Sequence, residues 1–230
     1  MNANSLSLPT PKTQTGGATA QQHRLAHLAG AVYLVIILTG MFAEFFVRAG
    51  LIVPGDAAAT ASNIVANESL FRANITADLI MIVADIIIGL LFYLIFRPVN
   101  RGLALLTTFF RLAQATILGA NLLNLFYALM LFKTAEGAAE GAAGVQALGM
   151  MFLEGHGIGY TIALLFFGIN LLILGYLVIK SGYFPQILGV LLIVAAVAYI
   201  ADTIGMVQIA TYADYSAIID TAVLIPAFIA

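Results

Sequence analysis

The sequence contains no cysteine and no tryptophan, and only 9% of its residues are charged. Without cysteine the chain can form no disulfide, no thiolate metal site and no cysteine nucleophile. A soluble domain carries roughly 25% charged residues, so too little charge is present here to cover a water-exposed surface. Hydrophobic residues make up 62% of the chain, and its net charge of −2 excludes the basic surface that nucleic acid requires. We therefore expect a membrane protein whose main solvent is the lipid bilayer.

Long apolar runs predict an all-α, polytopic bundle of six transmembrane helices. About 20 helical residues cross the hydrocarbon of a bilayer, and six stretches approach or exceed this length. They cover residues 28–47, 75–96, 103–132, 152–179, 184–209 and 216–230. The last stretch stops at Ala230 within an apolar run, so we expect this helix to be truncated or to end against a partner.

The remaining residues predict a tail and short connections. Residues 1–22 are polar and rich in Thr, Gly, Ala and Pro, a composition that predicts a disordered tail, and residues 23–230 would form one transmembrane domain. Residues 56–70 begin with Asp56, which can cap a helix, and mix apolar with polar positions. They predict a short helix lying on the membrane surface.

The distribution of lysine and arginine predicts which end of the bundle faces the cytoplasm. The N-terminal flank and the turns near residues 97–101 and 180 carry basic residues and no acidic one, whereas the other connections mix both signs. Cytoplasmic loops are enriched in Lys and Arg. We therefore expect a protein of the cytoplasmic membrane with a cytoplasmic N-terminus and with residues 56–70 outside.

Three polar side chains are expected near the centre of the bilayer, where an ionisable group is costly and is a candidate for a functional site. Counted from the cytoplasmic helix ends at about 1.5 Å per residue, Asp85, Arg111 and Asn170 all lie about 15 Å deep. We predict an Asp85–Arg111 ion pair with Asn170 as its hydrogen-bond partner. Such a pair could fix helix register or bind a substrate or a proton.

A second polar group is expected nearer the outer face, where five helices contribute a carboxylate or a histidine at a similar depth. Converging side chains of these types could bind a divalent metal or a proton, although at helix ends they could simply face water. The sequence has no HExxH motif to support a metal site, and no other cofactor is predicted. The members of this outer group are Glu44, Asp78, His156, Asp202 and Asp220.

A polar stripe is predicted on the third helix. Arg111, Gln114, Asn121 and Asn124 follow at spacings of three, seven and three, which places them on one face. In a membrane this face must contact protein or a wet cavity, or its amides must link helices. Gln114 and Asn121 are therefore candidate ligand-binding residues beside the central pair.

Short motifs mark the helices and their ends. They are Phe71-Arg72, Arg111-Leu112, Phe166-Phe167-Gly168 and the run GYLVIKSGYFPQILG at residues 175–189. In these motifs the chain resembles a mainly bacterial family of multi-helix membrane proteins that is catalogued as a domain of unknown function. The resemblance covers residue 24 to the end, and implies a helical membrane fold of about six or seven spans with no established activity.

The sequence leaves three functional hypotheses open. The favoured one is a transport-type protein that binds a small molecule or a lipid in an outward-facing polar cavity. Asp85, Arg111 and Asn170 would form the floor of this cavity, and the outer aspartates its wall. The second is an intramembrane, metal-assisted hydrolase acting on lipid through His156 and the outer carboxylates. The third is an accessory subunit that packs on a membrane-protein partner, and a homo-oligomer is equally open.

Overall fold

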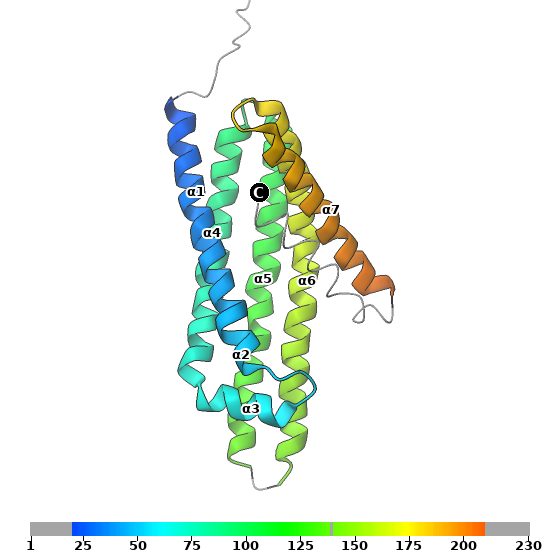
Figure 1. Ribbon diagram of the computed structural model, residues 1–230. Coiled ribbons are helices and arrows are strands. Elements are labelled where there is room, and N and C mark those ends of the chain that lie inside the picture. Colours follow the sequence, from blue (N-terminus) through cyan, green and yellow to red (C-terminus); the bar gives the residue numbers. More distant parts are fainter. Residues whose placement is uncertain (1–19, 139, 210–230) are drawn as a thin grey trace, which may run out of the picture.

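The computed structural model describes residues 20–138 and 140–209, and each element in this part of the chain is helical (Figure 1). The first helix, α1, continues without interruption through the π-helical segment η1 into α2. The elements are α1 (Ala20–Met41), η1 (Phe42–Arg48), α2 (Ala49–Leu51), α3 (Ala57–Ala66), α4 (Glu68–Phe96), α5 (Arg101–Glu136), α6 (Ala142–Ser181) and α7 (Gln186–Gln208).

Five helices in the described ranges are long and apolar enough to cross a membrane: Ala20–Leu51, α4, α5, α6 and α7. The prediction of an all-α membrane bundle is therefore confirmed. The helices run further than predicted, because α5 has 36 residues and α6 has 40. The first helix begins at Ala20, inside the range predicted as a tail, and residues 1–19 lie outside the described residues. The predicted sixth helix, at residues 216–230, lies outside the described residues.

Local sequence explains where the helices begin and end. The Asn100 side chain accepts a 3.0 Å hydrogen bond from the backbone N–H of Leu103 and caps the start of α5. At the end of α6, Gly182 adopts a positive φ of 65°, a conformation that glycine favours. These two turns give the α4–α5 and α6–α7 connections that the sequence predicts.

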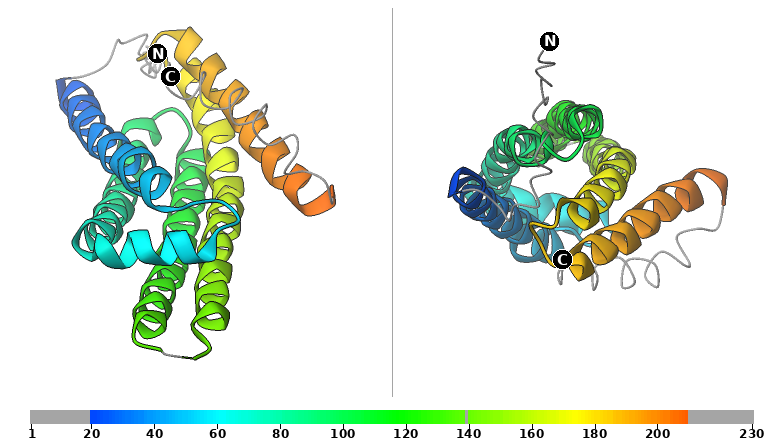
Figure 2. Two further views of the ribbon diagram at one scale, coloured as in Figure 1. Left: turned by 60° about the horizontal axis from the view of Figure 1, so that its bottom comes forward. Right: turned by 90° about the horizontal axis from the view of Figure 1, so that it is seen from above.

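The five long helices form an open ring rather than a closed bundle. Consecutive helices pack against one another from α4 to α7, and α1 packs on α4. The backbones of α1 and α7 do not come together, and the view along the bundle shows the gap between them (Figure 2). The N-terminus of α1 and the α4–α5 and α6–α7 turns lie at the same end of the bundle, as predicted (Figure 1).

Helix α3 crosses the opposite end of the bundle, and the α5–α6 hairpin extends past it (Figure 1). Its N-terminus is capped by Asp56, whose carboxylate accepts a 2.8 Å hydrogen bond from the N–H of Ala59. Ala61 and Ile64 are buried in a core cluster with Leu125 of α5. A short helix lies within the predicted range of residues 56–70, but it ends at Ala66 and its apolar face packs on protein.

Helices α6 and α7 approach most closely where two glycines meet. A Cβ atom on Gly175 would lie 2.7 Å from the carbonyl oxygen of Gly189, and a Cβ on Gly189 would lie 2.6 Å from that of Gly175. A Cβ atom on Gly168 would likewise lie only 3.1 Å from the carbonyl oxygen of Ala196. The small glycines thus allow α6 and α7 to pack closely along this crossing.

Candidate functional site

The central ion pair predicted from the sequence is present. The Arg111 guanidinium donates from Nη2 to Oδ1 of Asp85, and each residue is only 1% exposed. The guanidinium also lies over the rings of Phe167, at 4.8 Å, and Tyr33, at 5.6 Å, which favours a cation. Gln114 lies at the edge of the group, with its Nε2 atom 3.5 Å from Oδ2 of Asp85.

Asn170 does not bind this pair, so that part of the prediction is wrong. Its Nδ2 atom donates a 2.7 Å hydrogen bond to the backbone oxygen of Thr107, and the Thr107 hydroxyl donates to the backbone oxygen of Asn170 at 3.2 Å. Thr107 lies one turn before Arg111 on α5. Asn170 therefore meets α5 one turn away from the guanidinium and ties α5 to α6 instead.

A second buried cation, Arg48, was missed by sequence reasoning. Its Nη1 atom donates to Asp78 at 2.7 Å and to Asn74 at 2.9 Å, and its Nε atom donates to Glu44 at 2.8 Å. Arg48 is 6% exposed and Asp78 is 2% exposed. The apolar run predicted a first helix that ends at residue 47, which left Arg48 in the connection that follows. A signal for it was present in the sequence. Glu44 and Arg48 are four residues apart, so they are neighbours if the helix continues, and Asp78 had no predicted partner.

His156 joins a third polar group, on the facing surfaces of α5 and α6. The Nδ2 atom of Asn121 lies 3.1 Å from Nδ1 of His156 and donates to the His156 backbone oxygen at 2.8 Å. Asn124 donates from Nδ2 to Oδ1 of Asn121 at 2.8 Å. The polar stripe of α5 is thus divided between two places: Arg111 and Gln114 meet α4, whereas the two asparagines meet α6 or each other.

The members of the predicted outer metal site that lie in the described ranges do not come together. In the described ranges no three histidine, aspartate or glutamate side chains come together in a way that could hold a metal ion. Glu44 and Asp78 instead share Arg48, and His156 contacts Asn121. Asp202 lies on α7, and Asp220 lies outside the described residues.

A large cavity lies inside the open ring, with a volume of about 1260 Å³. All five long helices and η1 contribute to its wall, which is mainly apolar and aromatic. Asp78, Asp85, Arg111 and Asn170 do not line it, although Tyr33 and Phe167, which cover Arg111, do. Its polar side chains gather towards one end, on the side of α3. They include Glu44, Arg48, His156, Tyr160 and Asp202.

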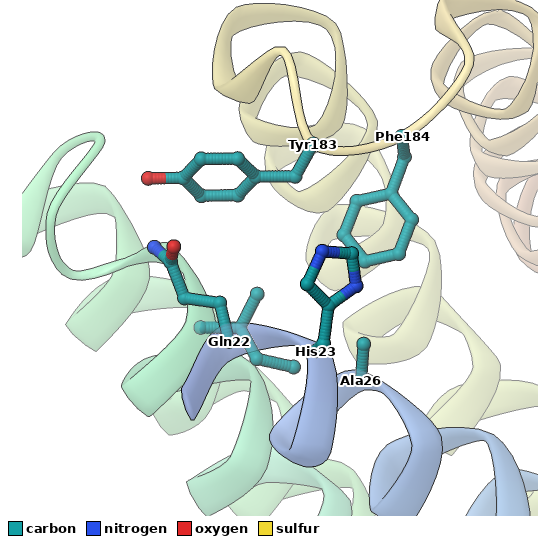
Figure 3. A pocket seen from close by; sticks show the side chains of 6 residues that line it. Gln22, His23, Ala26, Tyr183 and Phe184 are labelled. Carbon is teal, nitrogen blue, oxygen red and sulfur yellow. The ribbon is translucent and has the colours of Figure 1, made fainter. Parts of the chain in front are cut away.

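A much smaller pocket lies at the other end of the bundle (Figure 3). Gln22 and His23 of α1 point towards Tyr183 and Phe184 in the α6–α7 turn. Its volume is only about 50 Å³, so it has no room for a ligand of lipid size. It does show that α1 and the α6–α7 turn come together at this end, where Phe184 also lines the large cavity.

The fold and its interior define an α-helical membrane bundle with two buried ion pairs and a large apolar cavity. The profile of a family described as a domain of unknown function (DUF4386) matches residues 28–230. The chain belongs to this family, as its motifs indicate.

One relative carries the printed name "Uncharacterized protein" and comes from Archaeoglobus fulgidus. It is 30% identical over 129 residues, which are 56% of this chain and 64% of the relative. The chain therefore covers less than two thirds of that relative's length. No solved structure matches the chain.

Proposed function

We propose that the protein is a transport-type binding protein that holds an apolar, lipid-sized ligand in the cavity between its helices. The observation that carries this proposal is the cavity itself. Pockets for small molecules usually measure roughly 300–1,000 Å³ and combine an apolar wall with a few polar groups. At about 1260 Å³, this cavity exceeds that range and keeps its polar groups mainly at one end.

The length of the cavity suits a molecule taken from the bilayer. Lining residues run along the first helix from Ala26 to Arg48, a rise of about 33 Å at 1.5 Å per residue. The hydrocarbon core of a bilayer is about 30 Å thick. An extended alkyl chain therefore matches the cavity in length and polarity better than a compact polar solute does.

The gap between α1 and α7 supports entry from the side. The backbones of these two helices stay apart, whereas each helix packs against its other neighbour in the ring. At the Arg48 end of the cavity, Ala49, Ile52 and Pro54 continue the wall. The chain then enters α3, which crosses this end of the bundle (Figure 1). This differs from the outward-facing cavity expected from the sequence, because α3 covers the end that was expected to be open. The proposed route for a ligand is lateral, between α1 and α7.

Filling the cavity tests the proposal. Gly30 and Gly157 line it, and a Cβ atom added at either would have no neighbour within 4 Å. Each Gly→Leu substitution should therefore fold normally and yet occupy space that a ligand needs. We expect affinity to fall at least about fivefold, equivalent to about 1 kcal/mol of steric conflict. Gly119→Leu is the matched control, since Gly119 also has open space but lies outside the cavity wall.

The absence of tryptophan provides the readout for this test. Phe45 lines the cavity, and Phe109 is 57% exposed on α5 outside it, so each can be replaced by a single tryptophan. In nanodiscs, 9,10-dibromooctadecane should quench Phe45→Trp saturably at low mole fraction and Phe109→Trp only in proportion to its concentration. Equal, non-saturating quenching at both positions, unaffected by the leucines, would refute the proposal.

We also propose that the end with Arg97, Arg101 and Lys180 faces the cytoplasm of a bacterial inner membrane, which places α3 outside. The chain has no cysteine, so single cysteines report on each end without background. A membrane-impermeant maleimide applied to intact cells should label Glu140→Cys and spare Pro98→Cys until the cells are lysed. The reverse pattern would invert the proposed orientation.

A further inference from the structure

The hydrogen bonds around His156 fix which of its ring nitrogens carries the proton. Asn121 accepts from Asn124 with its side-chain oxygen, and its Nδ2 atom donates to the backbone oxygen of His156. A flipped Asn121 amide would place two oxygens 2.8 Å apart, so its NH₂ group must face His156. The same NH₂ lies 3.1 Å from Nδ1, which must therefore act as an acceptor.

A competing contact is weaker. Nδ1 of His156 also lies 3.4 Å from the backbone oxygen of Asn121, which would suit a proton on Nδ1. That proton would then face the Asn121 NH₂ at 3.1 Å, donor against donor. Because the contact with the NH₂ group is the shorter of the two, Nδ1 is the acceptor. The neutral imidazole therefore carries its proton on Nε2.

Two N–H donors are left facing the cavity. In the described part of the chain, no hydrogen-bond partner is found for Nε2 of His156 or for Nη2 of Arg48. Each residue is 6% exposed, and neither nitrogen belongs to the fully enclosed polar atoms without a partner. Both nitrogens therefore keep an open surface. Since both residues line the cavity, this surface faces the cavity.

These donors carry no surplus positive charge. Arg48 is paired with two carboxylates, Asp78 at 2.7 Å and Glu44 at 2.8 Å, so this cluster is already negative by one charge. A ligand anion would meet this negative charge without a cation to offset it, in a region of low dielectric constant. A ligand cation would be attracted by this negative charge, but it would place its own charge against two N–H donors and leave both without an acceptor.

From these donors and this charge balance we infer that the ligand is an apolar molecule whose polar group is an uncharged hydrogen-bond acceptor, such as a ketone, ester or quinone oxygen. This inference rests on the proposed binding function. The acceptor oxygen takes hydrogen bonds from Nε2 of His156 and Nη2 of Arg48, and the alkyl chain extends along α1 towards Phe184.

Four probes with the same chain length separate the classes: 2-tetradecanone, tetradecane, tetradecanoate and tetradecyltrimethylammonium. Each competes with 9,10-dibromooctadecane, which has no acceptor oxygen, in the full-length Phe45→Trp protein. We expect 2-tetradecanone to displace the brominated probe at a concentration at least tenfold lower than either ion. His156→Phe should reduce the preference for the ketone over the alkane about fivefold, since one neutral hydrogen bond contributes about 1 kcal/mol. His27→Phe, outside the cavity wall, is the matched control and should leave the preference unchanged.

The outcomes separate the inference from the function on which it rests. If an ion displaces the probe as well as the ketone does, or if His156→Phe leaves the preference for the ketone unchanged, the inference is overturned while saturable quenching still supports a binding protein. If no saturable quenching occurs, both fail. Should His156→Phe not fold, the comparison of the four probes in the unsubstituted reporter decides alone.

Discussion

Replacing Arg111 by leucine should destabilise the protein by about 3–5 kcal/mol, because it leaves the Asp85 carboxylate buried without its cation. Replacing both residues together, as Asp85→Leu and Arg111→Met, should restore most of that loss. Charges taken out of water are costly, and a well-packed apolar pair of similar volume is often as stable as a buried ion pair. The free energy of unfolding, measured by SDS titration in mixed micelles, checks both expectations.

An exposed pair provides the control. Arg72 donates to Glu68 at 2.7 Å, but their side chains are 54% and 29% exposed. Arg72→Leu should therefore change stability by about 1 kcal/mol or less. If Arg111→Leu lowered the free energy of unfolding no more than Arg72→Leu does, other groups or water would have to stabilise the Asp85 carboxylate. The central pair would then not be isolated from other charges. If the double variant folded well and still bound the brominated probe, the pair would be a structural element that supports the cavity.

Alanine at Gly175 and Gly189 together should separate α6 from α7. Each new Cβ would lie under 3 Å from a backbone carbonyl of the facing helix, and a backbone oxygen cannot rotate away. The helices must move apart, and overpacking of this kind costs about 1–3 kcal/mol. The double variant should therefore lose stability in the same SDS titration.

The matched control for this contact is Gly119→Ala, because a Cβ at Gly119 has no neighbour within 4 Å. It should cause no loss of stability. If the Gly175/Gly189 double variant were as stable as this control, the close crossing of α6 and α7 would not hold in the membrane. A variant that folds with separated helices should also widen the gap beside α7 and speed the exchange of the brominated probe.

The fold was largely predictable because lipid imposes a simple rule on sequence. A membrane-spanning segment must satisfy its own backbone hydrogen bonds and be apolar for about 20 residues, so helix number and order follow from hydropathy. Helix ends were less predictable. Residues 133–136 and 142–151 continue α5 and α6 beyond the apolar cores of these helices, since helical hydrogen bonding does not stop where hydropathy falls.

The central pair was predictable because two features agreed. Asp85 and Arg111 lie at equal depth on helices joined by a tight turn, which makes them neighbours. Asn170 lies at the same depth, but depth does not give the rotation of α6 about its axis, and its side chain meets Thr107 instead. Arg48 was missed because a one-residue difference in a helix boundary moves an arginine from the interior to a loop.

The cavity could not have been predicted from the sequence. Its wall combines residues of all five long helices, many of them far apart in the sequence. Its existence depends on α1 and α7 staying apart. Hydropathy treats a residue that faces lipid and one that faces an apolar cavity alike. The sequence alone therefore favours one of the three functional hypotheses without showing the cavity on which it depends.

The length of the α5–α6 hairpin has a consequence for the membrane around it. The apolar part of α5, from Leu103 to Phe132, rises about 45 Å, against about 30 Å of hydrocarbon in an average bilayer. Residues near its far end, such as Met130 and Met151, remain 63% and 64% exposed. Such hydrophobic mismatch is relieved by tilt or by local thickening of the bilayer. An average bilayer must therefore either thicken locally around this hairpin or hold it at a tilt.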